Sequence, residues 1–285
     1  MILLFASDLH GRAGHYRALR MAAEAVRPGV LVLGGDLFPD DPADDPASMG
    51  THQPVYVAQE FRPWLAGLLR DLPGLSVLTI FGNRDWSSAA AAMEEEARKD
   101  PRLRILQHDR AVEVGGLWFV GYSKTPPTAW YVKDFERLDL PGDYPPAMGG
   151  ARWDPERRRA LPGRAKDQFA RYPTMQEELE KMVRPAGPWV FVAHAPPHDT
   201  VLDRTFQRDS VGSRAIRAAV ESRQPLLALH GHVHESPDVT GEHLCRLGAA
   251  TAVNVGQHIE ALSFAVIEVD QAAGRIVGVE RRRSS

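Results

Sequence analysis

Short apolar runs alternate with longer mixed segments along the first hundred residues. Three runs have the length and aliphatic composition of buried strands: 2–6, 30–33 and 76–81. Three further segments are predicted as helices that follow them: about 14–26, 54–71 and 88–99. This alternation predicts a parallel or mixed sheet with helices packed outside it.

The second half continues the pattern with longer interruptions. A hairpin is predicted from 112–114 to 117–120, because Gly115 and Gly116 supply its turn. The other expected elements are strands at 189–193 and 225–229, helices at about 174–184 and 213–222, and a closing antiparallel pair at 262–269 and 276–279. We therefore expect one α/β domain over residues 1–285.

Residues 123–172 depart from this pattern. Pairs such as Pro126-Pro127 and Pro162-Gly163 interrupt any long element there. A long irregular stretch inside a compact domain is usually functional or disordered, so we expect an insertion that acts as a lid or rim. Its large rings suit a flat, phosphate-bearing ligand: Trp130, Tyr131, Trp153 and Tyr172. The alternative is that its two tryptophans only anchor the insertion to the core.

Polar side chains appear where the predicted strands end. In chain order they are Asp8, His10, Asp36, Asn83, His194, His232 and His234. Ligands of open α/β sheets bind at the carboxyl ends of strands, so we expect these groups to converge. In an extended backbone, positions i and i+2 point the same way, so the D-x-H and H-x-H tripeptides would each aim two ligands into one pocket. Taken singly, Asp8 is also explained as a helix cap, Asn83 as a turn former and His194 as a packed core residue.

The order of these motifs resembles the calcineurin-like metallophosphoesterase superfamily. The matching motifs are Asp8/His10, Gly35-Asp36, Gly82-Asn83-Arg84-Asp85, His194 and Gly231-His232-Val233-His234. The stretch from His194 to Ser236 also resembles a branch of small bacterial and archaeal phosphoesterases. The resemblance implies a four-layer α/β/β/α sandwich of two mixed sheets flanked by helices, here with an irregular insertion. It also implies metal-dependent phosphoester hydrolysis, with phosphodiesters as the expected substrates.

The family arrangement implies a dinuclear centre of divalent transition-metal ions. One ion would bind Asp8, His10, Asp36 and His234, and the other would bind Asp36, Asn83, His194 and His232. Asp36 would bridge the ions, because one carboxylate can serve two cations. Mixed oxygen and imidazole donors suit Mn, Fe or Zn better than Ca or Mg. The donor types do not choose among these three metals, of which we expect Mn. A metal-bound hydroxide would then attack phosphorus, so Asp36 and Asn83 receive catalytic as well as metal-binding roles.

Arg84 departs from the family pattern, which has a histidine at this position. A guanidinium stays protonated in proteins, so Arg84 is not an ordinary general acid. It can donate a fork of two hydrogen bonds to phosphate oxygens, and we therefore expect a catalytic role for it. The alternative is an incidental ion pair with Asp85 or another surface acid. Asp85 itself is expected to cap the helix that starts at Trp86.

Composition narrows the competing functions. A net charge of −3 argues against a protein that binds nucleic acid mainly by neutralising phosphates. The locally basic segment 151–172 keeps a nuclease as one alternative, and a metal-dependent binding or regulatory protein without catalysis is another. The single Cys245 excludes an intrachain disulfide and suits a cytoplasmic location, and no apolar run has the length of a membrane span. The expected partner is a small phosphoester.

Overall fold

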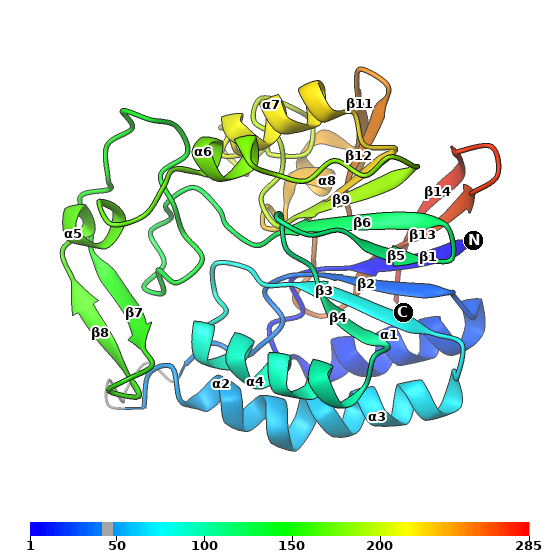
Figure 1. Ribbon diagram of the computed structural model, residues 1–285, viewed down its shortest axis with the longest axis horizontal. Coiled ribbons are helices and arrows are strands. Elements are labelled where there is room, and N and C mark those ends of the chain that lie inside the picture. Colours follow the sequence, from blue (N-terminus) through cyan, green and yellow to red (C-terminus); the bar gives the residue numbers. More distant parts are fainter. Residues whose placement is uncertain (42–47, 285) are drawn as a thin grey trace.

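Two six-stranded mixed sheets pack face to face, with helices on their outer sides (Figure 1). The computed structural model describes residues 1–41 and 48–284. The first sheet has the strand order β14 (Arg275–Arg283), β13 (Ser263–Asp270), β1 (Ile2–Ala6), β2 (Val30–Gly34), β3 (Ser76–Ile80) and β4 (Leu103–Ile105). Strands β1 to β4 are parallel, and β13 and β14 extend the sheet in antiparallel fashion.

The second sheet repeats this plan. Its order is β11 (Leu244–Leu247), β12 (Ala250–Asn254), β10 (Leu227–His230), β9 (Trp189–Ala193), β6 (Leu117–Tyr122) and β5 (Val112–Val114). The four central strands are parallel, and the two edge strands β11 and β5 are antiparallel to their neighbours. Both sheets are therefore mixed, as the resemblance implied.

Helices cover the outer face of each sheet. Beneath the first sheet lie α1 (Ala13–Val26), α2 (His52–Tyr56), α3 (Arg62–Asp71) and α4 (Ser87–Lys99) (Figure 1). On the side of the second sheet lie α6 (Met175–Glu180), α7 (Arg214–Arg223) and α8 (Ser236–Thr240). None of the helices in the described part of the chain has both the length and the apolar character needed to cross a bilayer.

Alternate residues of the central strands belong to different cores. Val30 and Val32 of β2 lie in the core between the two sheets, whereas Leu31 and Leu33 lie in the core between the first sheet and its helices. A strand that is buried on both faces needs apolar residues at every position. This two-sided burial explains the continuous apolar runs of the sequence, and the predicted fold class is confirmed.

Two predicted helices differ from expectation. The helix expected at 54–71 contains a π-helical segment, Val57–Phe61, between α2 and α3. Pro63 follows this segment, and it lacks the backbone N–H that a regular helix would use there. The helix expected at 174–184 ends at Glu180, because the N–H groups of Lys181 and Met182 bond three residues back rather than four.

The insertion contains regular structure that was not predicted. Strands β7 (Gly150–Asp154) and β8 (Arg159–Gly163) form a hairpin, and the short helix α5 (Ala165–Phe169) follows it. Gly150 marks a tight contact in this hairpin, since a Cβ there would collide with the carbonyl oxygen of Tyr131. Pro162 is tolerated because β8 is the edge of a two-stranded sheet.

Candidate metal centre

The loops that follow β1, β2, β3, β9 and β10 converge at one place. They carry all seven residues predicted as metal ligands: Asp8, His10, Asp36, Asn83, His194, His232 and His234. Contacts between the two sheets hold the loops together. The Nδ1 atom of His194 lies 2.7 Å from the carbonyl oxygen of Gly34, and the backbone N–H of His232 donates to the Asp8 carboxylate at 3.1 Å.

The backbone at the site is not extended. Asp8, His10, Asp36 and His232 have φ values of 59°, 47°, 50° and 67°, in the left-handed region. The reasoning from an extended D-x-H or H-x-H tripeptide is therefore wrong, because the chain turns sharply where each strand ends. Each such conformation costs a non-glycine residue about 1 kcal/mol or more. Hydrogen bonds from Asp8 N to Gly35 O and from His10 N to Asp36 O, both 2.9 Å, help to hold the turn.

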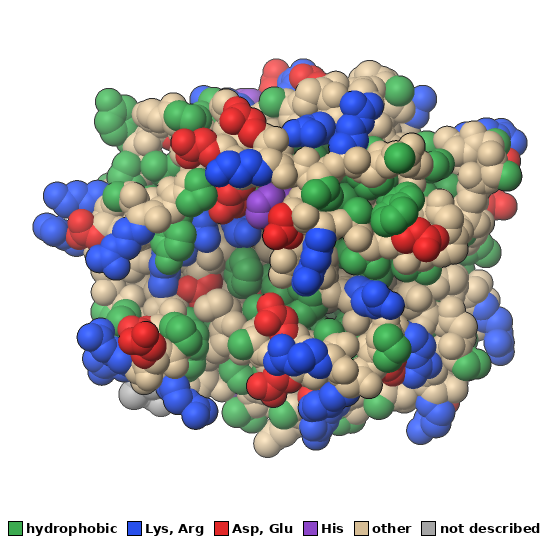
Figure 2. All heavy atoms as spheres, in the orientation of Figure 1, with side chains coloured by type: hydrophobic (Ala, Val, Ile, Leu, Met, Phe, Trp, Pro, Cys, Tyr) green, Lys and Arg blue, Asp and Glu red, His purple; other side chains and the backbone are tan. Residues whose placement is uncertain are grey.

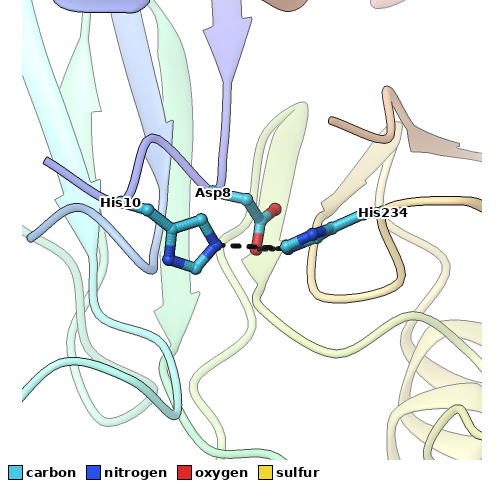
Figure 3. Close-up of side chains that lie close together, drawn as sticks. All are labelled: Asp8, His10 and His234. Carbon is cyan, nitrogen blue, oxygen red and sulfur yellow. Dashed lines mark hydrogen bonds and ion pairs between the residues drawn. The ribbon is translucent and has the colours of Figure 1, made fainter. Parts of the chain in front are cut away.

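One group of side chains contains Asp8, His10 and His234. The Nε2 atom of His234 lies 3.1 Å from Asp8 Oδ1 and 3.3 Å from the Nε2 atom of His10 (Figure 3). Two ring nitrogens that face each other at this distance need a proton or a cation between them, since two lone pairs repel. The three donor groups are close enough to hold one metal ion.

A second group contains Asp8, Asp36 and His194. The Nε2 atom of His194 lies 3.4 Å from Asp36 Oδ2 and 3.9 Å from Asp8 Oδ1, and these three donors can also hold one ion. The contact of His194 Nδ1 with the Gly34 carbonyl directs Nε2 toward the carboxylates. Asp8 belongs to both groups, whereas the bridging role predicted for Asp36 stays a proposal.

Asn83 and His232 form a third contact beside these groups. The Oδ1 atom of Asn83 lies 2.8 Å from the Nδ1 atom of His232, and the rings of His232 and His194 lie 5.3 Å apart between centroids. Gly82 allows the close approach, because a Cβ there would collide with Asp36 Oδ1. The structure thus places all seven predicted ligands within one continuous network of contacts.

The electrostatics of the network fit bound cations. Asp8 and Asp36 have exposed fractions of 0% and 2%, and no lysine or arginine side chain in the described part of the chain bonds to either. Burial opposes their ionisation, but the neighbouring imidazoles outweigh it. They hold the pKa of Asp8 well below its usual range and lower the pKa of Asp36 to about 2. Two buried carboxylates in contact with imidazole donors are a set that a divalent transition metal would complete.

The histidine pKa values predict a pH-dependent metal affinity. Burial disfavours the charged form of His194, but Asp36 outweighs it and raises the pKa of His194 to about 9. Relative to an unfolded pKa of about 6.5, this proton stabilises the metal-free fold below pH ~6.5, and the gain is lost as the pH rises through 9. A metal ion must displace the same proton. We expect the apparent affinity for Mn²⁺ to rise by about tenfold per pH unit from pH 6.5 to 9.

Calorimetric titration of the metal-free protein with Mn²⁺ at three pH values in this window tests the expectation. The same titrations in buffers of different ionisation enthalpy count the protons released. A constant affinity without proton release would show that His194 does not take up the ion.

Asp85 has a role that sequence reasoning assigned wrongly. Helix α4 begins at Ser87 without a side-chain cap from Asp85. Instead, the buried Asp85 carboxylate accepts hydrogen bonds from the backbone N–H groups of Leu37 (3.0 Å), Phe38 (3.2 Å) and Gly82 (2.9 Å). It therefore ties the loop that carries Asp36 to the loop that carries Asn83.

The N–H groups at the start of α4 have other acceptors. Trp86 N donates to Gln53 Oε1 at 2.7 Å, and Ser87 N donates to Asp134 Oδ2 at 2.7 Å. Asp134 belongs to the insertion, so the insertion helps to order the first turn of α4. No pattern in the sequence pointed to either acceptor.

Arg84 lies beside the candidate ligands. Its backbone N–H donates to Asp36 Oδ1 at 2.8 Å, and its guanidinium donates to Asp40 Oδ2 at 2.9 Å. The alternative of an ion pair with Asp85 or another surface acid is met by Asp40, whereas Asp85 is turned toward backbone N–H groups. The guanidinium carbon lies 3.9 Å from the centroid of the Trp130 ring.

A cleft of about 350 Å³ opens over this site. Its lining residues are Asp36, Asn83, Arg84, Thr128, Ala129, Trp130, His232, His234 and Glu235. The insertion thus contributes one wall, at 128–130. Larger open hollows exist elsewhere, such as one of about 630 Å³ beside α4, but neither of the candidate metal-binding groups found in the described residues lies there.

Comparisons with known proteins found a family and two similar folds. The sequence profile of the calcineurin-like phosphoesterase family matches residues 1–236. One solved structure aligns over 100% of this chain and 99% of its own, with a TM-score of 0.67 and 16% identity. The protein TT1561 of Thermus thermophilus aligns over 99% of this chain and 97% of its own, with a TM-score of 0.55 and 16% identity. At this identity the structural likeness shows the fold alone, and no curated protein sequence matched the chain.

Proposed function

We propose a finer function on the premise that the chain belongs to the calcineurin-like phosphoesterase family. In this proposal it hydrolyses phosphodiesters at a centre of two divalent metal ions. Metal-dependent hydrolysis of phosphoesters follows from the family itself. The finer proposal rests on one observation: two buried carboxylates, four histidines and Asn83 form one network at the ends of five strands. The mixed donors suit Mn, Fe and Zn alike, and of these we expect Mn.

The ligands would divide between two positions as the family resemblance implies. Asp8, His10, Asp36 and His234 would form one position, and Asp36, Asn83, His194 and His232 would form the other. The Asp36 carboxylate raises the pKa of His194 and opposes the lowering of the pKa of His10 by burial, so its charge acts on both sides. Asp8 acts on the same two histidines, so the choice of Asp36 as the bridging residue rests on the family resemblance.

Two bound divalent ions would lower the pKa of a water molecule toward neutrality and polarise the phosphoester. The chain's own residues then balance charge. Asp8 and Asp36 contribute two negative charges against four positive ones, which leaves room for one hydroxide and one singly charged phosphodiester. A doubly charged monoester would leave the site with a net negative charge. Arg84 adds hydrogen-bond donors to phosphate oxygens without giving up a proton.

Arg84→Ala is expected to lower kcat/KM. The fall should correspond to a loss of about 1.5–3 kcal/mol in transition-state stabilisation, the cost of a lost charged hydrogen bond. Because Arg84 transfers no proton, wild-type turnover should favour esters with good leaving groups. Steady-state kinetics with 4-nitrophenyl and phenyl diesters measures both effects. Arg104→Ala is the matched control, since Arg104 is exposed and, among the residues that the structure describes, donates only to the carbonyl oxygen of Pro101. Unchanged kinetics of Arg84→Ala would remove Arg84 from the mechanism.

A panel of substrates tests the function itself. The Mn²⁺-restored protein is assayed with bis(4-nitrophenyl) phosphate, 4-nitrophenyl phosphate and single-stranded DNA. We expect the diester to be hydrolysed with the highest kcat/KM. Cleavage of DNA alone would favour the nuclease, and metal binding without any turnover would favour a binding or regulatory protein.

The basic segment gives the nuclease limited support. Figure 2 shows basic side chains over the flank where Figure 1 draws β7, β8 and α5. Part of this charge is already paired within the protein. Arg164 pairs with Asp167 at 2.9 Å, and Arg152 donates to the carbonyl oxygens of Asp134 and Glu136. The small phosphodiester therefore remains the favoured substrate.

A further inference from the structure

The Arg84 guanidinium is held from two sides at the rim of the cleft. Asp40 accepts one of its N–H groups at 2.9 Å, and the Trp130 ring lies against its face with 3.9 Å between guanidinium carbon and ring centroid. The ring is held in turn, because Trp130 packs against the buried cluster of Trp86, Val132 and Ala151. A ring fixed in this way can orient the cation that lies on it.

A buried lysine shapes the loop that carries this ring. Lys133 has an exposed fraction of 1%, and its ammonium donates to Glu136 Oε2 (2.8 Å), to the carbonyl oxygen of Thr128 (2.9 Å) and to the carbonyl oxygen of Trp130. All three ammonium protons are therefore used. The second carboxylate oxygen of Glu136 accepts from the Thr128 hydroxyl at 2.5 Å, and that hydroxyl accepts from Trp130 N at 3.0 Å.

The same loop is tied to the hairpin of the insertion. Lys133 N donates to Ala151 O, and Ala151 N donates to Tyr131 O, both at 2.9 Å. The loop 128–133 is therefore fixed on three sides: by the ammonium of Lys133, by strand β7 and by the cluster under the Trp130 ring. Such a loop holds its wall of the cleft in one conformation.

We propose that Trp130 is a positioning residue, which holds Arg84 in the orientation that binds the substrate phosphate. The insertion then acts on catalysis through the chain of contacts from Lys133 to Trp130 to Arg84. An arginine side chain has several rotatable bonds, and fixing them before the ligand arrives removes an entropic cost from binding. This inference rests on the proposed function, because it assigns Arg84 a phosphate to bind.

Trp130→Leu tests the proposal by removing the aromatic face while keeping an apolar side chain against the cluster. Calorimetry measures the binding of inorganic phosphate to the Mn²⁺-loaded protein. We expect about fivefold to tenfold weaker binding, from the loss of the cation–π contact and of the fixed orientation. Trp130→Phe should restore most of the affinity. Trp153→Leu is the control, because Trp153 packs in the same cluster, whereas the Arg84 guanidinium lies on the ring of Trp130.

A double-mutant cycle separates this role from direct contact with phosphate. If Trp130 acts through Arg84, Arg84→Ala combined with Trp130→Leu should bind phosphate no more weakly than Arg84→Ala alone. Additive losses would overturn the proposal, and so would wild-type affinity in Trp130→Leu. A wild-type protein that neither binds phosphate nor hydrolyses any phosphoester would instead overturn the proposed function.

A second pair of substitutions tests the same chain of contacts from its buried end. Lys133→Met together with Glu136→Gln removes the ion pair without leaving one charge buried alone. We expect the same weakening of phosphate binding as in Trp130→Leu, with Mn²⁺ affinity unchanged. Lys124→Met is the control, since Lys124 lies in the same insertion but pairs with Glu178 at 3.8 Å. Unaltered phosphate binding in a folded double variant would contradict the role of Lys133.

Discussion

Asp36→Asn should abolish hydrolysis while the protein stays folded. Asp36 is buried and its charge acts on both His10 and His194, and a neutral amide would bridge two cations poorly. We expect kcat/KM to fall by at least about a thousandfold, because both ions lose a ligand. The fold should survive, since the Asn oxygen can still accept from Arg84 N and one of two neighbouring buried negative charges is gone.

Steady-state kinetics and thermal unfolding of the metal-free protein measure the two halves of this expectation. Asp41→Asn is the matched control, because Asp41 follows the same strand but accepts from Gly50 N and Trp86 Nε1. Substantial turnover by Asp36→Asn would rule out the bridging carboxylate. If Asp36→Asn loses turnover because it unfolds, the stated reason for the loss, a missing bridge between two ions, is wrong.

Asp85→Ala should destabilise the protein more than any other single change at the site. Three buried backbone N–H groups would lose their acceptor at once, those of Leu37, Phe38 and Gly82. We expect a loss of about 3–5 kcal/mol in the free energy of unfolding, since each orphaned donor costs about 1–3 kcal/mol and neighbouring losses are not additive. Metal affinity should fall too, because the loops of Asp36 and Asn83 would separate.

Asp85→Asn removes only part of these hydrogen bonds. The amide keeps one oxygen for Leu37 and Phe38 but turns an NH₂ group toward Gly82 N. Its unfolding free energy in urea should lie between the wild type and Asp85→Ala. Equal stability of Asp85→Ala and wild type would show that Asp85 does not tie the two loops.

The framework of the fold was predictable because strands that are buried on both faces form continuous apolar runs in the sequence. The run at Val30–Gly34 is apolar at every position, and its residues serve two cores in alternation. The edge strands β5 and β14 were predicted, whereas the edge strands β4 and β11 and the buried strand β12 were missed. Strand β11 has partly exposed positions, and β4 has only three residues, so neither forms a distinct apolar run.

The candidate ligands were predictable because each follows a strand and carries a donor group. Their geometry was not, since the positive φ of Asp8, Asp36 and His232 depends on hydrogen bonds to loops far along the chain. The resemblance named Asp36 as the bridge, whereas in the structure Asp8 belongs to both groups of donors. Asp36 as the bridge is therefore still a proposal.

The contacts of the insertion could not be predicted from the sequence for a similar reason. Asp139 accepts from Ser213 Oγ and Arg214 N, at 2.5 Å and 2.8 Å, and so binds the first turn of α7. The same holds outside the insertion, where Asp40 pairs with Arg84, 44 residues away. Such pairings depend on how loops pack together in three dimensions, and a carboxylate in a polar loop gives no local sign of its partner.

The number of metal ions bound per chain tests the central proposal most directly. Metal-free protein is dialysed against Mn²⁺, and the ions bound per chain are counted by elemental analysis, for wild type and for Asp36→Asn. We expect two ions in the wild type and at most one in the variant. One ion in the wild type, with full hydrolysis of bis(4-nitrophenyl) phosphate, would contradict a dinuclear centre.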